Sequence, residues 1–124
     1  PTKDWGQMDG FTIYHNPRWG KSRKALQLLR DNGIEPKIIE YLKDTPTTEE
    51  FQRLAKMLGK KPSEFIRQGE SLFKDNNVKE ILNDDTAMFK ALNQLPKIME
   101  RPIVVKGEKA VLGRPPENVL ELLW

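Results

Sequence analysis

The sequence predicts an α/β domain in which helices flank a four-stranded mixed sheet and a helical segment is inserted between the second and third strands. Three observations lead to this prediction. Short apolar runs typical of strands lie near both ends of the chain, and helical periodicities fill its middle. A length of 124 residues is also enough for one domain to bury a core without metals or disulfides.

The composition excludes several classes of protein. Hydrophobic residues make up 37% and charged residues 31%, which is typical of a soluble globular chain rather than a disordered or fibrous one. No apolar run approaches the roughly 18 residues that span a bilayer, and no signal peptide precedes the first pattern, so we expect a cytoplasmic protein without membrane contact. The 21 basic and 18 acidic residues are interspersed, which favours a mixed, solvated surface and no nucleic-acid partner. We also expect the protein to be a monomer.

The chain contains no cysteine. It therefore has no disulfide, no thiolate metal site and no thiol nucleophile of its own. Any redox chemistry would have to use a thiol from another molecule.

The first predicted secondary-structure elements begin at residue 11. Residues 1–10 are polar and aperiodic, and we interpret them as an N-terminal extension or expression remnant ahead of a domain that spans residues 11–124. The alternating run Phe11–His15 predicts a strand, which the Asn-Pro pair after it ends. Ser22 has the chemistry of an N-cap for the helix that follows, whose apolar side chains are those of Ala25, Leu26, Leu28 and Leu29. Gly33 is a suitable residue to end this helix.

A second strand and the helical insert come next. The run Pro36–Leu42 predicts the strand, and Thr47 or Thr48 can cap a helix that Gly59 closes. Phe51, Leu54, Ala55 and Leu58 give this helix its apolar face. Shorter helical patterns are predicted at Pro62–Arg67, Asn77–Leu82 and Thr86–Leu95.

The C-terminal part predicts a hairpin and a helix. The runs Arg101–Val105 and Lys109–Gly113 are separated by a Lys-Gly-Glu turn, as in an antiparallel hairpin. Pro115 and Pro116 suit a helix start, and apolar residues line one side of the terminal helix. The order β-α-β, helical insert, β-β-α is the organisation of a thioredoxin-like domain.

Four short stretches carry a resemblance to a known family: "TIYHNPRWGKSRKALQLL", "IRQGE", "ERPIVV" and "LGRPPE". Together they resemble the glutaredoxin-coupled arsenate reductases, whose pattern after the first strand is His-Asn-Pro-x-Cys-x-x-Ser-Arg. The resemblance runs from about Phe11 to Leu123, and the motifs occur in the family's order.

The resemblance assigns roles to particular positions. It places the family's catalytic cysteine at Trp19, and it matches His15 and Ser22 to the family's histidine and serine. The family's oxyanion-handling arginines map onto Arg67, Arg101 and Arg114, and its cis proline maps onto Pro102. Guanidinium forks and the free amides of Gly20, Lys21 and Ser22 at a helix start are groups that hold an oxyanion well. Singly, each arginine also fits an ordinary surface residue, and His15 a structural histidine.

The resemblance also implies a reaction. In the family a cysteine thiolate attacks arsenic, glutathione displaces the adduct, and glutaredoxin completes the reduction to arsenite, with no bound cofactor and no metal. Arsenate or a similar oxyanion and glutaredoxin are therefore the implied partners. Indole is not a nucleophile at arsenic, so the chain as written is expected to be inactive in this chemistry.

Alternatives remain open. Trp19 fits a deliberate substitution that removes the nucleophile, a natural loss that leaves a pseudoenzyme, or an altered activity in which a flat aromatic does the binding. The competing function is a non-catalytic binding or regulatory module, either of the type that contacts RNA polymerase or one that binds an anion.

Overall fold

The computed structural model describes residues 10–99, 102–113 and 115–122. These residues divide into two compact units, which are described separately. Of the described residues, the sheet unit comprises 10–41, 102–113 and 115–122, and the insert unit comprises 42–99. Within the described ranges, no helix is both long and apolar enough to cross a membrane.

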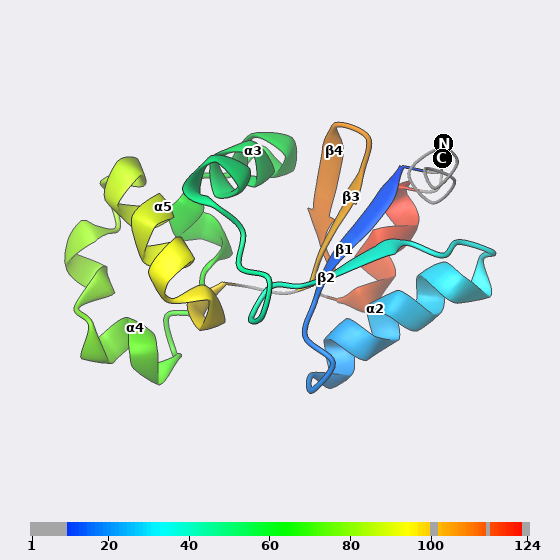
Figure 1. The fold of residues 1–124 in the computed structure, drawn as a ribbon, viewed down its shortest axis with the longest axis horizontal. Coiled ribbons are helices and arrows are strands. Elements are labelled where there is room, and N and C mark those ends of the chain that lie inside the picture. The colour runs from blue at the N-terminus through cyan, green and yellow to red at the C-terminus, as the bar shows by residue number, and fades with distance from the viewer. Residues whose placement is uncertain (1–9, 100–101, 114, 123–124) are drawn as a thin grey trace. The chain divides into compact units, whose positions relative to one another are not determined.

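The sheet unit contains four strands in the order β2-β1-β3-β4, as Figure 1 shows. Their bounds are β1 Phe11–His15, β2 Lys37–Glu40, β3 Ile103–Lys106 and β4 Lys109–Leu112. The pair β1 and β2 is parallel, and the pairs β1 with β3 and β3 with β4 are antiparallel. The mixed sheet predicted from the sequence is therefore confirmed, and its topology is that of a thioredoxin-like fold.

Helix α2 (Gly20–Asp31) and the 3₁₀ segment η5 (Pro116–Leu122) cover one face of this sheet. Side chains two residues apart on a strand share a face, so Phe11 and Ile13 of β1 both reach the core beneath the two helices. Leu29 of α2 is fully buried there, and burying such a side chain contributes about 2 kcal/mol of stability. Gly33, with φ +79, follows the end of α2, as its position in the sequence predicts.

The hairpin β3-β4 turns at Gly107, whose φ of +61 is one that glycine adopts without strain. The Lys-Gly-Glu turn predicted from the sequence is thus confirmed, with β3 one residue longer at its end than expected. The terminal helix is a 3₁₀ segment rather than an α-helix over its described residues.

The insert unit is helical and lies between β2 and β3 in sequence, as predicted. Its elements are α3 Thr48–Leu58, η2 Pro62–Phe65, α4 Ser71–Asp75, η3 Val78–Ile81, α5 Asp85–Gln94 and η4 Pro96–Ile98. Helix α5 packs against α3 and η2. Phe51, Phe65 and Leu92 are fully buried in this unit. The sequence analysis missed α4, because its five residues are too few to show a helical period.

The start of α3 is closed by its own side chains. The Thr47 hydroxyl accepts from the Glu50 amide at 3.1 Å, and the Glu50 carboxylate accepts from the Thr47 amide at 3.3 Å. This is a capping box, and Gly59 with φ +67 ends the helix. The sequence allowed either Thr47 or Thr48 as the N-cap of this helix, and the structure shows that it is Thr47.

Candidate functional site

The loop between β1 and α2 is organised by a buried asparagine. The Asn16 side-chain oxygen accepts from the Arg18 amide at 3.0 Å, and its main-chain oxygen accepts from the Trp19 amide at 3.1 Å. An asparagine that binds the backbone two residues ahead makes a turn of its own, and Pro17 fixes the next φ angle. The chain thereby passes from the end of β1 into a helix within four residues.

Ser22 is not the N-cap, and this prediction was wrong. Helix α2 begins at Gly20, and Trp19 occupies the N-cap position with no capping bond from its side chain. Ser22 is the third helical residue and is fully buried. The hydroxyl is engaged beneath the helix rather than at its end, because the Asn16 turn starts the helix earlier than the residue types alone indicate.

The partner of Ser22 is His15, the last residue of β1. The Ser22 Oγ lies 2.6 Å from His15 Nδ1 and also accepts from the Asn16 amide at 3.1 Å. We assign the hydroxyl proton to the bond with Nδ1, since this arrangement satisfies all three groups and leaves the imidazole neutral with its proton on Nε2. The two positions that the resemblance matches to the family's histidine and serine thus form a buried contact directly beneath the loop.

Burial lowers the pKa of His15 from its ordinary value of 6.5, because the charged imidazolium loses its hydration. Glu40 raises this pKa, whereas Arg30 and Arg23 lower it further. Glu40 is paired with His15 in the register of β1 and β2 and so lies on the same face. A neutral His15 agrees with the hydrogen bond that it receives from Ser22.

The start of α2 is open. The first amide bonded within the helix is that of Arg23, which donates to the Trp19 carbonyl at 3.0 Å. The amides of Gly20, Lys21 and Ser22 have no recorded acceptor in the described part of the chain, and the first turn carries no acidic residue. Such a helix start presents N–H groups and the positive end of the helix dipole, which suit an anion.

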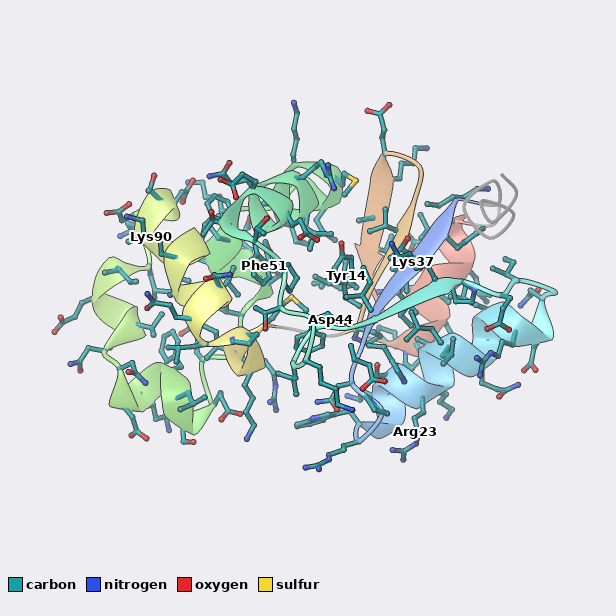
Figure 2. The ribbon with its side chains drawn as sticks, in the orientation of Figure 1. Tyr14, Arg23, Lys37, Asp44, Phe51 and Lys90 are labelled. Atoms are coloured by element: carbon teal, nitrogen blue, oxygen red, sulfur yellow. The ribbon has the colours of Figure 1, made fainter. Side chains whose placement is uncertain are left out.

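Arg23 secures this loop, a role that the sequence analysis missed. Its Nη1 donates to the Pro17 carbonyl at 2.9 Å, and Figure 2 shows it beside the loop that joins β1 to α2. The signal that could have revealed the contact is the helical spacing, which returns this side chain to the loop.

Trp19 occupies the position where the resemblance places the reactive thiol. The exposed fraction of this residue is 37%. It lies at the end of the loop and immediately before the three open amides. A side chain in this place meets the positive end of the helix, but indole has neither a titratable acid nor a nucleophilic sulfur for that field to activate.

Pro102 is buried and packs closely against Gly113. The Gly113 amide donates to the Pro102 carbonyl at 2.8 Å, and a Cβ on Gly113 would lie 2.8 Å from Pro102 Cγ. The residue before Pro102, Arg101, lies outside the described residues, so the cis bond expected there stays a prediction.

The three arginines predicted to bind an oxyanion stay a prediction as a group. Arg101 and Arg114 lie outside the described residues. Arg67 lies in the insert unit, where its amide donates to the Ile98 carbonyl at 2.6 Å and its Nη1 lies 3.4 Å from Glu70 Oε2. Glu70 belongs to the "IRQGE" stretch, but the sequence analysis gave it no role.

Among residues 10–99, 102–113 and 115–122, no three side chains of histidine, cysteine, aspartate or glutamate gather closely enough to hold a metal ion.

The fold and the loop together define a class: a thioredoxin-like domain in which an Asn-Pro turn and an open helix start form an anion-compatible site. Residues 14–122 match the model of the ArsC family. The chain therefore belongs to the ArsC family.

Its similarity to particular proteins supports this membership. It is 45% identical over 112 residues to the uncharacterized protein YfgD of Escherichia coli K12, covering 90% of this chain and 94% of that one. It is 42% identical over 112 residues to an arsenate reductase of Haemophilus influenzae, covering 90% and 97%. These relatives extend over nearly the same length of chain.

Two solved structures are similar in fold and sequence. An arsenate reductase from Vibrio cholerae has a TM-score of 0.87 and 44% identity, covering 90% of this chain and 96% of that one. A putative arsenate reductase from Yersinia pestis has a TM-score of 0.85 and 40% identity, covering 90% and 98%.

Proposed function

We propose that this chain has the architecture of a glutathione- and glutaredoxin-dependent arsenate reductase whose nucleophile position is held by Trp19. Membership of the ArsC family and the names of its relatives support the reaction class. The chain has no cysteine, so it has no thiol with which to attack arsenic. As written, it does not catalyse the thiol-dependent reduction.

The observation that carries this proposal is the state of the loop around Trp19. The His15 and Ser22 pair is intact, and the amides that follow Trp19 are open. These parts are the ones that lower the pKa of a thiol and hold an oxyanion in a site of this kind. Residue 19 is thus the missing component of a site that is otherwise suited to the reaction.

The roles of the other residues follow from their chemistry. The amides of Gly20, Lys21 and Ser22 bind oxygen atoms of the anion, and Lys21 adds positive potential. The resemblance assigns anion-binding guanidinium groups to Arg67, Arg101 and Arg114. His15 and Ser22 hold the loop between β1 and α2 in place. Glutathione is a co-substrate rather than a bound cofactor, and glutaredoxin is the protein partner.

The test is to restore the thiol. In Trp19→Cys, a thiolate displaces an oxygen of arsenate, and two thiols from glutathione and glutaredoxin then supply the two electrons that release arsenite. NADPH consumption is followed with glutathione, glutaredoxin and glutathione reductase present. We expect arsenate-dependent consumption with Trp19→Cys and none above background with the unaltered chain.

Trp19→Ser is the matched control, because serine has nearly the size of cysteine but no thiol. It should remain inactive, and circular dichroism should show the same helix content in both variants. A Trp19→Cys protein that folds, titrates one thiol of lowered pKa and still leaves arsenate unreduced would contradict the reductase proposal.

One observation favours a second candidate, a non-catalytic binding module of the type that contacts RNA polymerase. Trp19 is among the exposed large hydrophobic side chains of the described residues, and exposed tryptophans frequently anchor protein interfaces. Binding of purified RNA polymerase to the unaltered chain and to Trp19→Ala tests it. A measurable affinity that the alanine variant loses, together with an inactive Trp19→Cys, would establish this alternative.

A further inference from the structure

Arg67 is held by a carboxylate from its own unit. Its Nη1 lies 3.4 Å from Glu70 Oε2, and both side chains are largely shielded from water, with 26% and 11% of their surfaces exposed. Shielding strengthens such a pair, because the field between the charges is screened less than at an open surface. The pair therefore restricts where the guanidinium can lie.

The backbone on both sides of the pair is fixed as well. The Arg67 amide donates to the Ile98 carbonyl, and Ile66 forms an isolated antiparallel bridge with Met99. The Glu70 amide donates to the Arg67 carbonyl at 3.1 Å, and the Glu70 carbonyl accepts from the Phe73 amide at 3.0 Å at the start of α4. Arginine and glutamate therefore extend from one short, well-anchored turn.

We propose that Glu70 is a positioning and specificity-determining residue for an oxyanion held by Arg67. This inference rests on the proposed function, which gives Arg67 its anion-binding role. Holding the guanidinium in place reduces the conformational entropy that anion binding would otherwise cost. Glu70 also places a negative charge within reach of any anion on Arg67.

That charge discriminates between anions by their protons. Near neutral pH, phosphate and arsenate each retain an O–H group that can donate a hydrogen bond to a carboxylate. Sulfate has no such proton, so its oxygens only repel Glu70. A carboxylate beside the guanidinium therefore favours protonated oxyanions over sulfate.

The experiment measures inorganic phosphate and sulfate binding by calorimetry at constant ionic strength. Trp19→Ser is the parent protein, so that every variant has the same residue at position 19 and carries neither an indole nor a thiol there. Arg67→Ala, Glu70→Gln and Glu70→Ala are added to it singly. Glu80→Gln is the matched control, because Glu80 is an exposed residue of the same unit whose carboxylate makes no hydrogen bond or ion pair among the described residues. Thermal unfolding of each variant checks the fold.

Each arm has its own expected result. Arg67→Ala should weaken both anions about tenfold, as expected for loss of a charge-assisted bond. Glu70→Gln keeps a hydrogen-bond acceptor but removes the charge, so the preference for phosphate over sulfate should fall about tenfold, mainly because sulfate binds better. Glu70→Ala should abolish the preference and weaken phosphate further, because Arg67 then loses its ion pair with Glu70. Glu80→Gln should change neither affinity.

The contrary results are distinguishable. If Arg67→Ala binds both anions as the parent does, the oxyanion role of Arg67 in the proposed function is wrong, and the role of Glu70 falls with it. If Arg67→Ala weakens binding but both Glu70 variants keep the parent's preference, only the proposal for Glu70 is overturned. Tighter phosphate binding in both Glu70 variants would show that the carboxylate competes with the anion rather than positioning Arg67.

Discussion

Two helices of this protein begin in opposite ways. Helix α3 is closed by the reciprocal bonds of Thr47 and Glu50, and its first turn carries Glu49 and Glu50. Helix α2 has no side-chain cap and no acidic residue in its first turn, and its first amides are open. Both begin after a residue with extended backbone angles, so the difference comes from the side chains and not from the course of the chain.

The comparison shows which helix start is available to a ligand. A capping box satisfies the orphan amides internally and adds negative charge, so an anion gains little there. An open start relies on water or on an external acceptor. The start of α2 has no side-chain cap. It is stabilised instead by the Asn16 turn that precedes it and by the buried hydrogen bond between His15 and Ser22.

The largest expected difference between the two starts is in the pKa of a thiol placed at each. In Trp19→Cys, the helix dipole and nearby cations should lower the pKa to roughly 6 to 7, whereas in Thr47→Cys the two glutamates should keep it near 8.5. The pH dependence of iodoacetamide alkylation measures both values. Equal pKa values in the two variants would show that the open start exerts no special field.

The next effect concerns the packing under α2. A Cβ on Gly113 would lie 2.8 Å from Pro102 Cγ and 3.4 Å from Ala25 Cβ of α2. Gly113→Ala should therefore lower the free energy of unfolding by about 1 to 3 kcal/mol, as measured by urea denaturation. Gly69→Ala is the control, because nothing lies within 4 Å of its added Cβ, and it should change stability by less than about 0.5 kcal/mol.

Smaller changes in stability are expected when the cap of α3 is removed or when an acidic residue is added to the first turn of α2. Thr47→Ala removes the side-chain acceptor of α3 and should cost about 1 kcal/mol, while Thr47→Ser should preserve most of the stability. Lys21→Glu adds an acid to the first turn of α2 and should stabilise it by about 0.5 kcal/mol while weakening phosphate binding. If Lys21→Glu left phosphate binding intact, the open start would not be the anion site.

The smallest effect is a pH dependence of stability through His15. Its pKa is lowered in the folded chain, so below the ordinary value of 6.5 the unfolded chain binds more protons than the native one. Stability should fall as the pH drops from about 6.5, and this loss should end once the pH is below the lowered native pKa. His15→Gln should remove this component of the slope in urea titrations between pH 7 and 4. An unchanged slope would mean that the folded chain does not resist the protonation of His15.

Much of the fold could be predicted because local signals agree with tertiary structure. β1 has the predicted bounds, and Thr47 and Gly59 bracket α3 as their residue types indicate. The order of elements, together with the family resemblance, predicted the mixed sheet. Segments too short to show a full helical period were harder to predict. Helix α4 was missed for this reason, and two of the short segments predicted to be helical are 3₁₀ turns.

The site was predictable in its residue types but not in its contacts. The motif around Trp19 identified His15 and Ser22, yet the role of Ser22 as a cap was wrong because the Asn16 turn moves the helix start to Gly20. The bond between Arg23 and the Pro17 carbonyl and the ion pair between Arg67 and Glu70 depend on side-chain geometry. Residue types alone do not select such partners.

The strand order has a consequence for how the chain folds. β1 is hydrogen-bonded to β2, which follows it after one helix, and to β3, which follows only after the whole insert. During synthesis the pairing of Ile13 with Val104 must wait until the whole insert and β3 have emerged, whereas the helices of the insert need only their neighbours. Closing that long loop is an entropic barrier. We therefore expect refolding to be limited by the joining of β1 to β3.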